Sequence, residues 1–158
     1  MTNRISSFIL IVFLYAAVHI SCAGFPAGET VQPLPEGKTM LPQQFTGTFR
    51  WEGVDETQRV VINIYNVSTV SGTITATGKG TYNTAGVVTI INVKISINTA
   101  TGFFEMWESN PDRESGFVTG GSHTGAISPD LKRIEAVWTT SDSGARGRLD
   151  LTAADPGN

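Results

Sequence analysis

The sequence predicts an all-β protein, an antiparallel up-and-down meander of about eight strands, and two observations carry this prediction. From Gln44 onward the chain has 10 valines, 9 isoleucines and 17 threonines but only 3 leucines. Side chains branched at Cβ lose rotamer freedom in helices and pack well on a pleated sheet. Apolar and polar residues also alternate with a period of two in successive segments, and no segment shows a convincing helical period.

This alternation places the first four strands. In the first two strands, the residues that share one face are Phe45, Gly47, Phe49 and Trp51, and then Val60, Ile62 and Ile64. The third strand is expected from Val70 to Tyr82, with Gly72, Gly78 and Gly80 on one face. Glycines weaken strands, so we expect a tight bend or a close approach of another element there, with room for a ligand as the alternative. The fourth strand is expected from Val87 to Asn98.

The last four strands are expected at 102–108, 117–127, 134–138 and 145–151, where short alternating runs recur between turn sequences. The connecting segments are rich in Asn, Asp, Ser, Pro and Gly, and they lie at 83–86, 98–102, 110–112, 128–130 and 141–144. Short links force consecutive strands to be antiparallel. The meander then buries its apolar face by closing into a barrel or by folding into a sandwich. We favour the barrel because closure removes exposed edge strands.

The first 23 residues have the order of a secretory signal peptide. Arg4 and the amino terminus are positive, residues 8–18 form an uninterrupted apolar run, and Ser21-Cys22-Ala23 offers small residues for cleavage. The run is short for a membrane span. We therefore expect a secreted or periplasmic protein.

Cys22 leaves two alternatives open. Ile20-Ser21-Cys22 resembles the end of a bacterial lipobox, which would make Cys22 a lipidation site and the protein an outer-membrane lipid-anchored one. His19 departs from that pattern, which has an aliphatic residue at this position. Cleavage after Ala23 would instead remove the cysteine.

Residues 24–43 contain four prolines and no apolar period, so we expect a flexible tether. It would lead into a barrel domain at 44–154 and a disordered tail at 155–158.

Composition excludes several classes of function. Eleven basic against fourteen acidic residues leave no basic field for nucleic acid. A single cysteine cannot form a disulfide within the chain, and with two histidines it provides too few ligands for a His/Cys metal cluster. We expect no cofactor.

Gly47-Thr48-Phe49 followed by Trp51 resembles the Gly-x-Trp signature on the first strand of lipocalins, with Phe49 in the place of the tryptophan. The resemblance implies that Arg146 or Arg148 on the last strand packs across the aromatic ring. An avidin-like order is also suggested by Gly72–Tyr82, Trp107 and Trp138. Both likenesses imply a calycin-type barrel at the level of architecture only, and biotin binding is not carried over.

Catalytic residues are not evident. His123 follows two glycines and a serine, and we expect it to be a solvated side chain on a strand. Ser122 points to the opposite face, which argues against a Ser/His pair. The acidic cluster of Glu105, Glu108, Asp112 and Glu114 is expected to be a charged strand end and turn, because Glu105 and Glu108 face opposite ways.

The sequence therefore predicts an exported, non-catalytic barrel that holds a small apolar or amphipathic molecule. Its wall would be formed by Phe49, Trp51, Ile74, Ile91 and Trp138. The alternative is a structural or protein-interaction module of the cell envelope that acts through an exposed pair, Phe103 and Trp107. A hydrolase is a third hypothesis.

Overall fold

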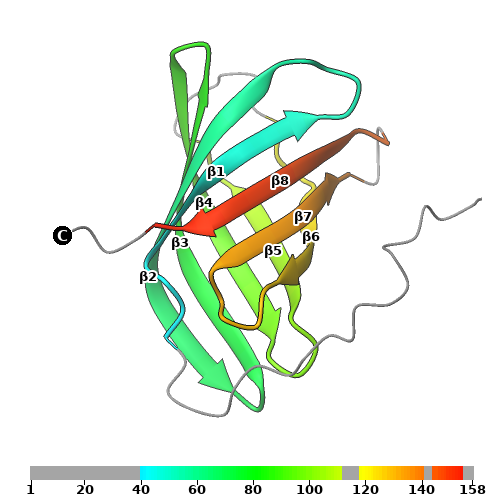
Figure 1. The fold of residues 1–158 in the computed structure, drawn as a ribbon. Helices are drawn as coiled ribbons and strands as arrows, with labels where there is room; N and C mark the ends of the chain where they lie inside the picture. Colours follow the sequence, from blue (N-terminus) through cyan, green and yellow to red (C-terminus); the bar gives the residue numbers. More distant parts are fainter. Residues whose placement is uncertain (1–39, 112–117, 141–143, 155–158) are drawn as a thin grey trace, which may run out of the picture. The chain divides into compact units, whose positions relative to one another are not determined.

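A computed structural model describes residues 40–111, 118–140 and 144–154, and the described chain is all-β. Eight antiparallel strands follow one another in a meander, and β8 pairs with β1 to close the barrel (Figure 1). The strands are β1 (Gln44–Trp51), β2 (Thr57–Val70), β3 (Thr73–Thr84), β4 (Val87–Asn98), β5 (Phe103–Ser109), β6 (Ser122–Ile127), β7 (Arg133–Thr139) and β8 (Arg146–Ala153). The predicted fold class is confirmed, and the architecture is compatible with that of calycins.

The interior of the barrel is packed with apolar side chains. Apart from the second half of β2, alternate residues of the strands point inward, as on β4, where Ile91, Val93, Ile95 and Ile97 are all buried. Phe45, Phe104 and Leu149 meet them from β1, β5 and β8 in one continuous core. The two-residue period seen in the sequence is therefore the period of burial.

The second and third strands differ from the prediction. β2 runs on to Val70, and Ser71 and Gly72 form the turn to β3 with φ of 47° and 76°. Two consecutive left-handed residues give the twist that favours a tight β-hairpin, and glycine adopts this conformation without strain. The register shifts between Ile64 and Asn66, so a bulge breaks the alternation on which the prediction depended.

Two of the three glycines expected at a bend do allow close packing. A Cβ on Gly78 would collide with the backbone carbonyl of Asn63 on β2. A Cβ on Gly80 would lie 3.1 Å from side-chain atoms of both Ile62 and Ile91. Gly78 thus permits close approach of the β2 and β3 backbones. Gly80 leaves room for the side chains of Ile62 and Ile91 in the core.

The two ends of the barrel differ in what fills them. At one end, here called the pocket end, β1, β3, β5 and β7 finish and β2, β4, β6 and β8 begin (Figure 1). The opposite end, the closed end, holds Met40–Gln43 and the β2–β3, β4–β5 and β6–β7 turns. Leu41 and Leu131 are buried there. Side chains that open to a cavity are found at the pocket end.

Candidate functional site

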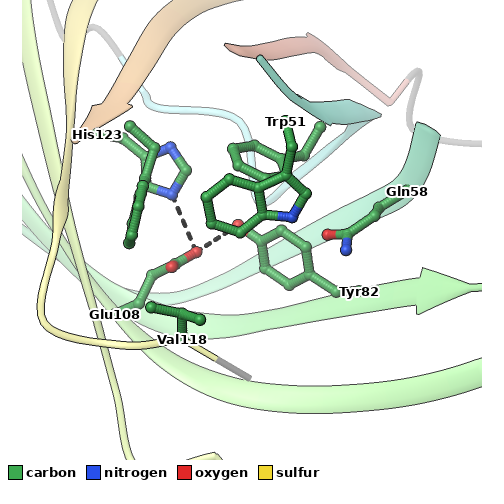
Figure 2. A pocket seen from close by; sticks show the side chains of 8 residues that line it. Trp51, Gln58, Tyr82, Glu108, Val118 and His123 are labelled. Carbon is green, nitrogen blue, oxygen red and sulfur yellow. Dashed lines mark hydrogen bonds and ion pairs between the residues drawn. The ribbon is translucent and has the colours of Figure 1, made fainter. Parts of the chain in front are cut away.

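A small cavity lies at the pocket end, where residues from six strands converge (Figure 2). Its lining consists of Phe49, Trp51, Gln58, Tyr82, Glu108, Val118, His123 and Trp138. The free space is about 10 Å³, which is room for about one water molecule. The cavity as it stands therefore accommodates a single small polar group.

Three polar side chains form one buried network in this cavity. The Tyr82 hydroxyl donates a hydrogen bond to Oε1 of Glu108, and Nε2 of His123 lies 3.0 Å from the same oxygen (Figure 2). Tyr82, Glu108 and His123 are 3%, 8% and 1% exposed. They come from β3, β5 and β6, so the barrel closure brings together groups that are distant in sequence.

His123 is incompletely satisfied in this environment. Its contact with Glu108 is at ion-pair distance, but neither Nε2 nor Nδ1 has an aligned hydrogen-bond partner among the described residues. A buried polar atom without a hydrogen bond costs about 1–3 kcal/mol. Such an atom in a native fold calls for an explanation, and an ordered water, an ion or a functional role are the usual ones.

The electrostatics of the cavity are dominated by Glu108. Burial, and then the charge and hydrogen bond of the Glu108 carboxylate, raise the pKa of Tyr82 well above its ordinary value. The phenol therefore stays protonated and serves as a donor. Among the described residues that line the cavity there is no lysine or arginine, and the ion pairs of Arg133, Arg146 and Arg148 lie on the exposed surface.

Aromatic rings surround the polar network. Phe49 meets Trp51, Tyr82 and His123 edge-to-face, with ring centroids 4.9, 6.2 and 5.8 Å away. Trp51 in turn meets Trp138 at 5.0 Å in the same geometry. These are favourable aromatic arrangements, and they fix the rings that form the cavity wall.

Two glycines make room for these rings. A Cβ on Gly147 of β8 would lie 2.5 Å from Cε2 of Phe49, and a Cβ on Gly121 would lie 2.5 Å from Cε2 of Trp138. Real Cβ atoms do not approach so closely, so any side chain at either position would displace a ring.

The implied packing of an arginine across Phe49 is wrong. Arg146 and Arg148 have side chains 58% and 67% exposed and pair with acidic residues outside the barrel. Gly147 between them faces inward against Phe49, because alternate residues of a strand point to opposite faces.

The five residues predicted to form the wall divide into two groups. Phe49, Trp51 and Trp138 line the cavity, whereas Ile74 and Ile91 are buried in the core and are not among the lining residues. The second predicted pair is exposed on β5, Phe103 at 48% and Trp107 at 38%. Their role in binding a partner stays a prediction. Cys22 lies outside the described residues.

The expectation of a solvated His123 is wrong, and so is that of Glu108 as a surface charge at a strand end. Glu108 shares its inward parity with Phe104 and Met106 on β5, and His123 shares its parity with Ile127 on β6. The two-residue alternation therefore indicated that both side chains point into the barrel. The prediction instead followed the usual preference of charged side chains for water. Glu105 faces the other way, as predicted, while Asp112 and Glu114 are not in the described segments.

The arrangement favours binding over catalysis. A carboxylate beside an imidazole is the orienting pair of many hydrolases, but nucleophilic catalysis also needs a hydroxyl or thiol within reach. No serine, threonine or cysteine is among the described lining residues, and the Tyr82 hydroxyl is bonded to Glu108. No group of three or more potential metal ligands occurs in the part of the chain that the structure describes.

Comparisons with protein-family models, with curated proteins and with solved structures found no match. In the described segments, no helix has the length and apolar character needed to cross a membrane. The geometry of the cavity is therefore the basis for the functional assignment.

Proposed function

We propose that this protein is an exported, non-catalytic β-barrel that binds a small amphipathic ligand at the pocket end. The observation that carries the proposal is the buried Tyr82–Glu108–His123 network inside an aromatic wall, with a histidine nitrogen that has no hydrogen-bond partner among the described residues. Pockets that combine an apolar lining with a few convergent polar groups are the usual form of small-molecule sites. Export rests on the signal-like residues 1–23.

The size of the cavity determines how such a ligand would lie. With room for about one water molecule, the site takes the polar head of the ligand and leaves its apolar part at the mouth. Trp51 is half-buried, and Val118, a lining residue, is 50% exposed. Val54 in the β1–β2 connection and Val87 and Val88 at the start of β4 are exposed at the same end. Covering this apolar rim contributes about 25 cal/mol per Å² before the costs of association.

The likeness to lipocalins and avidins is part of this proposal. It is supported by the closed eight-stranded meander and by the position of Phe49, which stands where lipocalins have the signature tryptophan. In this chain Phe49 lies on the cavity wall beside His123.

Tryptophan fluorescence tests the proposal directly, because Trp51 and Trp138 line the cavity and Trp107 lies on the outer face of β5. We expect Trp107→Phe protein to show a saturable change in emission when titrated with short single-chain amphiphiles. The same titration of Trp51→Phe protein should give a smaller change. No saturable response to any head group, together with no co-purified ligand in native mass spectrometry, would refute the proposal.

The second candidate function is that of a cell-envelope interaction module. Phe103 and Trp107 favour it, since large apolar side chains exposed on the same face of one strand suit a protein contact. In that case Trp107→Ala should abolish crosslinking to an envelope partner without affecting amphiphile binding at the pocket end.

A further inference from the structure

We infer that the head group of the ligand is a protonated primary amine. This inference rests on the proposed function and adds the chemical class of the ligand. It follows from three properties of the cavity: its charge, the hydrogen-bonding groups left free, and its size.

The charge of the cavity favours a cation. Glu108 is buried, and no lysine or arginine stands among the described lining residues. A buried carboxylate is costly unless it is paired and hydrogen-bonded. Tyr82 donates a neutral hydrogen bond and His123 lies beside it, so an arriving ammonium group would supply a positive charge that no lysine or arginine of the described lining supplies.

The free hydrogen-bonding capacity of the cavity is that of an acceptor. Nε2 of His123 lies 3.0 Å from the Glu108 oxygen, and in the neutral tautomer that donates from Nε2 to this oxygen the other ring nitrogen is an acceptor. Nδ1 then carries the lone pair, and it has no partner in the described chain. An ammonium N–H can donate to this nitrogen, whereas a carboxylate head group cannot.

The size and the walls of the cavity select the type of amine. A primary ammonium group is close to a water molecule in size and fits a space of about 10 Å³. A trimethylammonium group is too large for this space. Trp51 and Phe49 line the cavity, and an aromatic ring attracts a cation that lies over its face.

The test compares four ligands with the same tail: n-octylamine, n-octanol, octanoate and octyltrimethylammonium. Titrations of the full chain at neutral pH, where the amine is protonated, are followed by tryptophan emission and by calorimetry. We expect the amine to bind at least about tenfold more tightly than each of the others. Tightest binding of octanoate, or equal binding of octanol and the amine, would overturn the inference but leave the proposed function standing. Absence of binding by all four, together with no co-purified ligand in native mass spectrometry, would refute both.

Variants on β5 test whether Glu108 is responsible for the preference for the amine. Glu108→Gln keeps the shape and an acceptor for Tyr82 but removes the charge, so it should lose about tenfold in affinity for the amine and keep that for octanol. Glu105→Gln is the matched control, since Glu105 lies on the same strand and faces outward. It should bind like the unaltered protein.

A measurement on the unaltered protein avoids any dependence on folding of the variants. The ¹⁵N chemical shift of His123 Nδ1 should move from that of a free lone pair towards that of a hydrogen-bonded one when the amine is added. A shift that stays constant at saturation with amine would contradict the contact with Nδ1.

Discussion

Gly147→Ala should destabilise the barrel and distort the cavity together. A Cβ at this position would lie 2.5 Å from Cε2 of Phe49, closer than real Cβ atoms come to any neighbour. Phe49 is 3% exposed and meets Trp51, Tyr82 and His123, so the only described free volume beside its ring is the cavity of about 10 Å³. The clash must be relieved by shifting the ring or the backbone of β8.

The magnitude follows from the cost of overpacking. Extra carbon in a filled core costs about 1–3 kcal/mol. In a domain of this size each kilocalorie lowers Tm by roughly 4–6 °C, so we expect a decrease of roughly 5–15 °C. Gly147 does not have a left-handed φ, and alanine at a compatible backbone position otherwise stabilises by about 0.4–1 kcal/mol. Loss of stability would therefore report the contact with Phe49.

Thermal unfolding followed by circular dichroism measures this effect, and a double-mutant cycle assigns it. Phe49→Leu removes the clashing ring atoms, so Gly147→Ala should cost less in that background than in the unaltered protein. An unchanged Tm for Gly147→Ala would refute the packing described here. Equal costs in both backgrounds would show that the loss arises elsewhere than at Phe49.

Four further predictions concern the Tyr82 hydrogen bond, titration and the outer surface. Tyr82→Phe should lose about 1–3 kcal/mol in urea unfolding at neutral pH, because Glu108 loses its buried donor. The raised pKa of Tyr82 means that the unfolded chain ionises first, so the stability of the unaltered protein should fall as pH rises above about 10; an identical alkaline decline in Tyr82→Phe would exclude Tyr82 as its source. Trp107→Ala should change unfolding free energy by less than about 0.5 kcal/mol, since the side chain is partly exposed on the outer face; a large drop in Tm would mark it as part of the core. Hydrogen bonds from the Ser128 hydroxyl and the Lys132 backbone lower the pKa of Asp130. Its contribution to stability is therefore present above its unfolded pKa and is lost as pH falls through the lowered folded value. Asp130→Asn should flatten the plot of unfolding free energy against pH in this acidic range.

The fold could be predicted because burial in a single curved sheet follows the two-residue period directly. The prediction of strand boundaries failed where turn residues happened to fit the two-residue alternation. Val70 and Gly72 continue the alternation of Ile74, yet Ser71-Gly72 is a turn. The bulge at Tyr65 then hid the continuity of β2 from Thr57 to Val70.

The site could be predicted only in part, because periodicity gives the face of a residue and not its level along the barrel. Phe49, Trp51 and Trp138 could be predicted to line the interior because they stand on the apolar face of their strands. Ile74 has the same inward parity but is paired with Ile97, far from the pocket end. Which inward residues meet depends on the register between strands. The Glu108–His123 contact is set by such pairing and has no local sequence signal.

Pairing of β1 with β8 also places both attachment points of the barrel at the closed end. Gln44 begins β1 there, its carbonyl accepts a hydrogen bond from the Ala154 amide, and β1 carries the chain roughly 25 Å before Trp51 reaches the cavity. Anything joined ahead of Met40 or beyond Ala154, such as a fused reporter or a solid support, therefore starts on the side remote from the mouth. An attachment made at Met40 or at Ala154 therefore leaves the mouth at the far end of the barrel.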